Sequence, residues 1–147
     1  MEAKAQQYLN SYLESLSDGD RQRYRSFSAD YFCADEYNAN RCAELVAEGI
    51  KTATCSLKYW YETGEEPMPV VGHLQVVTDW CGNPTSIIET TSVSECKFSA
   101  VDEAFAFAEG EGDRSLAWWR QAHWEFFSRE CDGAGITPTE DMMLVLE

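Results

Sequence analysis

The sequence predicts an α+β domain, and three features indicate this class. Helical periodicity dominates the first half of the chain, residues 72–98 alternate in the manner of strands, and a second helical region precedes a short apolar strand at the end. The 147 residues fit one domain with one core, because a chain of this length buries most of its unfolded surface. Hydrophobic residues make up 44% and aromatic residues 13%, which excludes a disordered chain.

The first predicted element is an amphipathic helix over residues 3–16. Its apolar residues recur at helical spacing: Tyr8, Leu9, Tyr12, Leu13 and Leu16. The segment from residue 17 to residue 39 has weaker periodicity and many turn formers, so we expect an irregular or short helical connection. Together these residues, 1–39, are predicted to form an N-terminal helical extension that packs on a domain of residues 40–147.

The next helix is predicted over residues 40–48. Asn40 is a good N-cap residue, and Gly49 suits the left-handed position that follows a helix. Ser56 is predicted to cap a further helix that closes at Gly64.

A hairpin is predicted after Pro69. Residues 72–80 alternate and contain β-branched side chains, residues 81–84 read C-G-N-P and form the turn, and residues 85–98 are one long strand candidate. Beyond the hairpin, Ser99 and Asp102 resemble a capping box that opens a helix over residues 100–109.

The last part of the chain predicts a long helix and a strand. Gly110 and Gly112 interrupt the preceding helix, and Asp113 or Ser115 caps the next one, which runs to Cys131. Residues 142–146 read M-M-L-V-L and form a short apolar strand. We expect this strand to close a small sheet or barrel.

The charge balance limits the partners. With 26 acidic and 11 basic side chains, the net charge is −15, which repels polyanions and argues against binding to duplex DNA. The one cluster of bases is Arg21, Arg23 and Arg25, and a solvated face is favoured there over a phosphate patch.

Cysteines and histidines give no metal motif. The six cysteines form no C-x-x-C, and His73 and His123 are the two histidines, so we expect neither a metal nor another cofactor. The first residues, M-E-A-K-A-Q-Q, lack an apolar core of signal-peptide length, so we expect no signal peptide, and the sequence contains no apolar run of bilayer length. We therefore expect a cytoplasmic protein with reduced thiols and no membrane partner.

Residues 48–56, E-G-I-K-T-A-T-C-S, hold the main candidates for chemistry. A lysine that faces a pocket can act as a base, whereas a lysine on the surface says nothing about the function of the protein. Lys51 and Thr54 point to opposite sides of an extended chain, so a shared site requires a bend. Thr54 is the candidate nucleophile if a base removes its proton, and Thr52 is the more structural of the two threonines.

A second group of candidates lies in the segment E-G-E-G-D. The glycines around Glu111 allow the backbone to approach a ligand, and Glu109 competes for the same role. Trp119 and Trp60 are candidates to stack on a base. His123 lies one helical turn from Trp119 and is interpreted as a packed histidine.

Two of these segments, G-I-K-T-A-T and E-G-E-G-D-R-S-L-A-W-W-R-Q-A-H-W-E-F-F-S-R-E, together resemble the ASCH family over roughly residues 40–147. The resemblance implies a PUA-like fold, a small β-barrel with flanking helices whose mouth binds RNA or a nucleoside. The chain departs from compact members of the family by the region before residue 40 and by an aromatic insert, K-Y-W-Y-E-T-G-E-E-P.

In one compact branch of the family, similar enzymes hydrolyse the acetyl amide of N(4)-acetylcytidine with a lysine, a threonine and a glutamate. The matching residues are Lys51, Thr54 and Glu111. Other members are regarded as ribonucleases or as RNA binders.

The sequence therefore predicts a hydrolase of a modified nucleoside. Thr54 attacks the acyl carbon, Lys51 takes its proton, and Glu111 orients the lysine or protonates the leaving amine. The alternatives are a ribonuclease and a non-catalytic module that binds short single-stranded RNA, in which Lys51 meets a phosphate. The oligomeric state is not predicted. The residues expected to contact substrate are Gly49, Thr52, Trp60, Glu109, Arg114, Trp119, Ser128 and Arg129.

Overall fold

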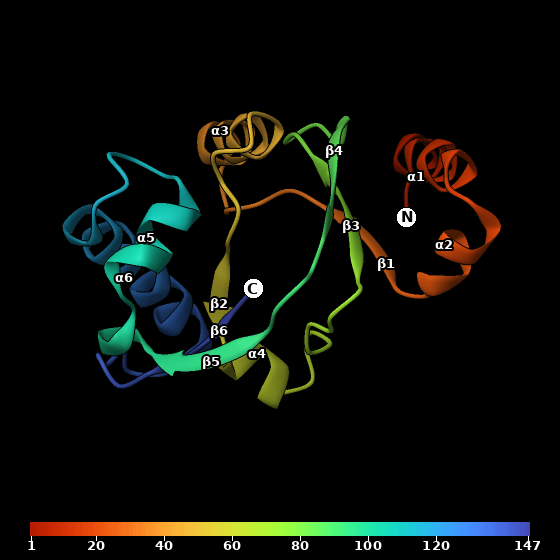
Figure 1. Cartoon of the computed structure of the whole chain (residues 1–147). Helices are drawn as coiled ribbons and strands as arrows, with labels where there is room; N and C mark the ends of the chain where they lie inside the picture. Colours follow the sequence, from red (N-terminus) through yellow and green to blue (C-terminus); the bar gives the residue numbers. More distant parts are fainter. The chain divides into compact units, whose positions relative to one another are not determined.

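A computed structural model describes all of residues 1–147 (Figure 1). The chain divides into two compact units that alternate along the sequence. The first unit comprises Met1–Gly49 and Pro69–Ser92, and the second comprises Ile50–Met68 and Val93–Glu147. These units do not coincide with the predicted N-terminal extension of residues 1–39 and domain of residues 40–147. That division of the chain stays a prediction. No helix is both long and apolar enough to span a membrane.

The first unit contains a three-stranded sheet in the order β1-β3-β4. Strand β1 (Phe27–Asp30) runs parallel to β3 (Leu74–Thr78), and β3 pairs antiparallel with β4 (Pro84–Glu89), as expected for the predicted hairpin. The helices of this unit are α1 (Ala3–Ser15), α2 (Asp18–Arg23) and α3 (Glu36–Ala47).

Helix α1 packs on the sheet of the first unit. Leu9 is 2% exposed and contributes to a core with Tyr24, Leu74 and Val76. The predicted helix over residues 3–16 is confirmed within one residue. The predicted irregular connection is partly wrong, because it contains α2 and β1; the Ser17 side chain caps α2 by accepting a hydrogen bond from the Asp20 N–H.

Helix α3 begins earlier than predicted. Asp35 is its N-cap, and its carboxylate accepts a hydrogen bond from the backbone N–H of Asn38 at 2.9 Å. Asn40 lies inside the helix, and its side-chain oxygen accepts a hydrogen bond from the backbone N–H of Trp80 at 2.9 Å. Gly49 follows the helix with φ +76°, as predicted.

The second unit contains a separate three-stranded sheet in the order β2-β6-β5 (Figure 1). Strand β6 (Met143–Leu146) is central and pairs antiparallel with β2 (Cys55–Leu57) and with β5 (Ser94–Lys97). The helices are α4 (Tyr59–Glu62), the 3₁₀ turn η1 (Phe98–Ala100), α5 (Glu103–Glu109) and α6 (Leu116–Ala134).

Helix α6 supplies the large side chains of the second core. Trp119 and Phe127 are 1% and 0% exposed, and the Trp119 ring stacks on Phe98 with centroids 5.3 Å apart. Leu57 from β2 and Leu144 from β6 complete the same cluster. The long helix and the closing strand are thus confirmed, with Ser115 as the N-cap of the helix.

Two sequence-based predictions in this region were wrong. Ser56 lies in β2 and caps no helix; its hydroxyl shares a hydrogen bond with the Tyr61 hydroxyl at 2.6 Å. The single long strand over residues 85–98 is two strands, β4 and β5, which belong to different sheets. The two sheets are not closed into a barrel, so the fold is α+β and the barrel is not confirmed.

Candidate functional site

The segment at residues 50–54 has no regular secondary structure. The backbone N–H groups of Thr52 and Ala53 both donate to the carbonyl of Ala108, at 2.8 and 3.1 Å. Thr54 and Glu147 exchange two backbone hydrogen bonds at 3.0 and 2.9 Å. The segment is therefore irregular, as the sequence predicted, and is fixed to the end of α5 and to the end of the chain.

Gly110 lets α5 approach this segment. It ends α5 with φ +76°, and a Cβ at this position would lie 2.7 Å from the carbonyl oxygen of Ile50. Only a residue without a side chain fits both constraints. The two glutamates that flank Gly110 are thereby held next to the segment that carries Lys51.

Lys51 is the centre of a buried polar cluster. The residue is 7% exposed, and its ammonium group donates to Glu109 Oε2 at 2.8 Å, to the Ala53 carbonyl at 2.9 Å and to Glu111 Oε2 at 3.4 Å. Three hydrogen bonds match the three N–H groups of an ammonium. The structure thus brings together Lys51 and Glu111, and it adds Glu109 as the closer partner.

The two carboxyl groups differ in their electrostatics. Burial opposes ionisation of Glu109, but the ammonium of Lys51, followed by smaller effects of other neighbours, outweighs burial and holds the pKa of Glu109 well below its usual range. Burial raises the pKa of Glu111, the negative charge of Glu109 raises it further, and Lys51 only partly offsets these effects. Glu109 is therefore the fixed negative charge, and Glu111 is the carboxyl group that more readily carries a proton.

His123 faces this cluster from α6. Its Nδ1 lies 2.9 Å from the carbonyl oxygen of Trp119, which can only accept, so Nδ1 carries the hydrogen and Nε2 has a free electron pair in the neutral ring. Nε2 lies 3.7 Å from Glu109 Oε2 and 3.9 Å from Glu111 Oε2. The ring also stacks on Trp119 with centroids 4.3 Å apart. The predicted packing of His123 is correct, but the sequence did not show that Nε2 faces two carboxyl groups.

The threonines of the segment are placed differently. Thr52 is exposed, and its hydroxyl donates to the Ala108 carbonyl at 3.3 Å. Thr54 is half-buried, and its hydroxyl makes no hydrogen bond to Lys51. The Lys51 ammonium nevertheless binds the carbonyl of Ala53, which belongs to the peptide group that precedes Thr54.

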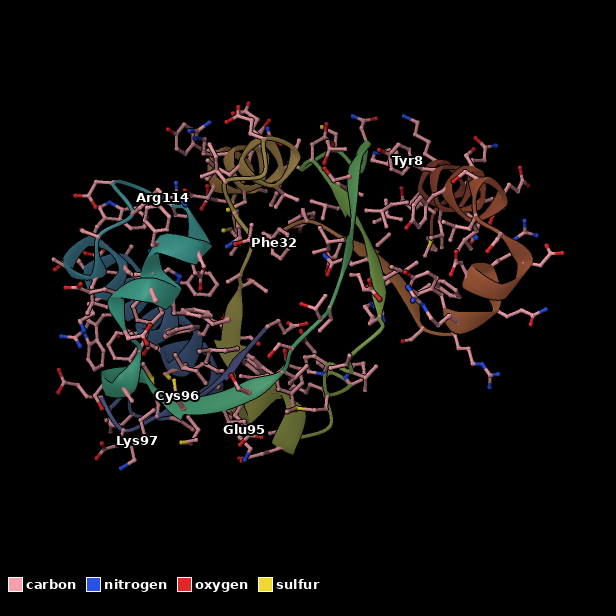
Figure 2. All side chains as sticks on the ribbon, viewed as in Figure 1. Tyr8, Phe32, Glu95, Cys96, Lys97 and Arg114 are labelled. Atoms are coloured by element: carbon pink, nitrogen blue, oxygen red, sulfur yellow. The ribbon has the colours of Figure 1, made fainter.

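Several predicted substrate-contacting residues have structural partners. Trp60 donates from Nε1 to Glu130 Oε2 at 2.7 Å, and Trp119 is buried in the second core. Arg114, labelled in Figure 2, donates to the carbonyl of Phe107 at 3.0 and 3.1 Å and covers the Phe107 ring at 3.5 Å. None of these three side chains forms a hydrogen bond or an ion pair with Lys51, Glu109 or Glu111.

The remaining predicted residues lie elsewhere. Gly49 follows α3 in the first unit. Ser128 and Arg129 are on α6; the Ser128 hydroxyl is buried without a hydrogen bond, and Arg129 donates from Nε to the Glu125 carbonyl at 3.3 Å.

Comparison with known proteins identifies the family. The family model described as the ASCH domain matches residues 28–147. The chain belongs to the ASCH domain family. This match includes β1 and α3, so the region that resembles the ASCH family begins earlier than residue 40.

Two solved structures resemble this ASCH domain protein. The crystal structure of the ASCH domain from Lactobacillus crispatus JV V101 is 60% identical, with a TM-score of 0.97, and the alignment covers 99% of this chain and 92% of that one. Protein EF3133 from Enterococcus faecalis V583, assigned to family DUF984, is 30% identical, with a TM-score of 0.76 and coverage of 96% and 80%. The search of curated proteins gave no match.

Proposed function

We propose that this ASCH domain protein hydrolyses the exocyclic amide of an N(4)-acylated cytidine-type nucleoside. The buried contact of Lys51 with Glu109 and Glu111, at 2.8 and 3.4 Å, is the observation that carries the proposal. Amide hydrolysis needs a nucleophile, a positive charge near the carbonyl oxygen and an acid for the leaving amine. This cluster provides the charge and the acid beside a threonine.

The different environments of the two glutamates support distinct roles. When neighbouring carboxyl groups have pKa values that are pushed apart, the group with the raised pKa is suited to be the acid. Glu111 has the raised pKa, and its side chain is 17% exposed, against 2% for Glu109. Glu111 therefore protonates the leaving amine, and Glu109 fixes Lys51.

Thr54 is the proposed nucleophile. The Lys51 ammonium first passes a proton to the Glu111 carboxylate, 3.4 Å away, because Glu111 is the group with the raised pKa. The neutral amine then takes the hydroxyl proton of Thr54 as the oxygen attacks the acyl carbon. The C–N bond breaks as Glu111 gives its proton to the amine, which leaves an acyl ester on Thr54. Water then hydrolyses this ester, releases the carboxylic acid and restores the hydroxyl.

The charge of the protein is compatible with this substrate class. A nucleoside carries no phosphate, so a net charge of −15 does not oppose its entry. A long RNA would meet repulsion from most of the surface, and its binding would have to be local.

The test is release of cytidine from N(4)-acetylcytidine. We expect Glu111→Gln to lower kcat by about 10²- to 10⁴-fold, the usual contribution of an acid or base. Glu103→Gln, an exposed substitution in the first turn of α5, the helix that precedes Glu111, is the matched control and should keep wild-type activity. Because the acid must be protonated, activity of the wild type should fall as pH rises through the raised pKa of Glu111. No cytidine release at high enzyme concentration contradicts the proposal.

Titration with short single-stranded RNA separates the two alternatives. Binding without turnover, weakened by salt and lost in Lys51→Ala, would identify a binding module. Cleavage of the RNA that is lost in Lys51→Ala would identify a ribonuclease.

A further inference from the structure

Three side chains beside Lys51 form a group with the chemistry of metal ligands. Cys55 lies on β2, Glu109 ends α5 and His123 lies on α6. The Cys55 sulfur, a carboxylate oxygen of Glu109 and a ring nitrogen of His123 all lie within 4.8 Å of one another. We propose that this group binds one thiophilic divalent cation of the zinc class.

The orientation of His123 supports the proposal. Its Nδ1 hydrogen is held by the Trp119 carbonyl at 2.9 Å, so the electron pair of Nε2 points into the cluster. Histidines that bind metals usually donate their other ring N–H in this way, which fixes the tautomer and the direction of the ring. The stack on Trp119 holds the ring plane as well.

The two oxygens of Glu109 give independent support. Oε2 accepts the hydrogen bond from Lys51 at 2.8 Å, whereas Oε1 is buried and has no hydrogen-bond partner. Glu109 is 1% exposed, so bulk water does not reach Oε1 to donate a hydrogen bond to it. Buried oxygens without a partner are costly, and a cation on Oε1 would remove this cost while Lys51 keeps Oε2.

The geometry requires only a small contraction. In a tetrahedral zinc site with one sulfur and two N or O ligands, the ligand atoms lie about 3.3 to 3.6 Å apart. The largest separation here is below 4.8 Å, so side-chain adjustments of about 1.5 Å or less close the site. Three protein ligands leave the fourth position open.

Cys55 binds the cation as a thiolate. Burial and then the charge of Glu109 raise the pKa of this thiol, so without a cation the thiol is neutral. Binding breaks the S–H bond, forms the metal–sulfur bond and releases the proton to solvent. Sequence patterns did not reveal the site because its ligands, at positions 55, 109 and 123, come from three elements with no motif spacing.

The experiment titrates the metal-free, reduced protein with Co²⁺, which replaces Zn²⁺ and is coloured. We expect one equivalent to produce thiolate-to-cobalt absorption and the visible bands of tetrahedral cobalt, and Zn²⁺ to abolish both. Cys55→Ser should remove the thiolate absorption, and His123→Gln should lower Co²⁺ affinity at least about 10-fold. The Co²⁺ titration does not depend on hydrolysis. If the protein does not hydrolyse N(4)-acetylcytidine, the titration still tests the metal site.

Cys33→Ser is the matched control, because the sulfurs of Cys33 and Cys42 lie 3.4 Å apart and form another place for a thiophilic cation. This variant should bind Co²⁺ as the wild type does. Absence of thiolate absorption in the wild type would overturn the proposal without any variant. Absorption that is lost in Cys33→Ser and kept in Cys55→Ser would overturn it as well.

Discussion

At the scale of single residues, Lys51 determines whether the interior of the second unit is electrostatically balanced. Its side chain is 4% exposed, and the carboxylate of Glu109 beside it is 2% exposed. Burial of either charge alone is expensive, and the pair is tolerated because each compensates the other. Lys51 therefore has a structural role that is separate from any catalytic one.

Lys51→Met should destabilise the protein by about 3 to 5 kcal/mol at neutral pH, because it leaves a buried carboxylate without a partner. Since Lys51 lowers the pKa of Glu109, the ion pair stabilises the fold above the unfolded pKa of Glu109, and this contribution is lost as pH falls through the folded pKa. The difference in the free energy of unfolding between Lys51→Met and wild type should accordingly become smaller at acidic pH. Urea unfolding of both proteins at several pH values measures this difference.

Lys97→Met is the control for this measurement. Lys97, labelled in Figure 2, lies on β5, and its pair with Asp141 spans 3.6 Å with both side chains more than half exposed. Such pairs contribute about 0 to 1 kcal/mol. Equal losses for Lys51→Met and Lys97→Met would show that the Lys51 pair is not buried in solution.

The sequence predicted part of the site. Lys51 and Glu111, which lie 3.4 Å apart, were found through a resemblance, and the role of Thr54 stays a prediction. The bend after Gly49 followed from the opposite directions of residues 51 and 54 in an extended chain. The roles of Glu109 and His123 could not be predicted in the same way, because they depend on which carboxylate oxygen reaches Lys51 and on the carbonyl that holds Nδ1.

At the scale of secondary structure, glycine at the end of α5 determines how close that helix comes to residues 50–54. Gly110 and Gly64 have nearly the same backbone angle, φ +76° and φ +77°. A Cβ on Gly110 would meet the backbone of Ile50 at 2.7 Å, whereas a Cβ on Gly64 would meet nothing within 4 Å. The two positions therefore separate the effect of the backbone angle from the effect of contact.

Gly64→Ala should cost about 1 to 2 kcal/mol, the penalty of a left-handed alanine. Gly110→Ala should cost about 1 to 3 kcal/mol more, because the added methyl group displaces the backbone of residue 50. Denaturant midpoints of both variants measure the difference. Equal losses of stability in the two variants would show that the backbone at Ile50 moves away from the added methyl group without a cost in free energy.

Helical periodicity predicted α1 and α6 well, because this signal is local, whereas the N-caps were predicted less well. Ser115 caps α6 as predicted, but α5 is capped by Asp102 and not by Ser99. Strand β1 was not predicted, because F-S-A-D has little apolar character and gains its stability by pairing with Leu74–Thr78 far along the chain. The break between β4 and β5 was missed for the same reason, since only long-range pairing assigns the two strands to different sheets.

At the scale of the whole molecule, the excess of negative charge lies on the surface. Lys51 is buried together with its partners Glu109 and Glu111, so burial removes positive and negative charge at once and leaves the acidic excess of the composition outside. The surface is thus strongly acidic, which favours neutral or cationic ligands over polyanions. A nucleoside substrate and a divalent cation both meet this condition.

The interleaving of the two units has a consequence for a chain that is cut. Val70 and Val71 are 50% and 65% exposed in a segment without regular structure, so a protease that cleaves after valine should nick the chain there. Each fragment would then carry part of both units: β1 and β2 remain on the first fragment, and their partners β3 and β6 are on the second. The nicked protein should elute as one species in native gel filtration and as two in urea. Fragments that separate without denaturant would show that these strand pairs do not hold the halves together, whereas fragments that stay joined would behave as a noncovalent heterodimer made from one gene product.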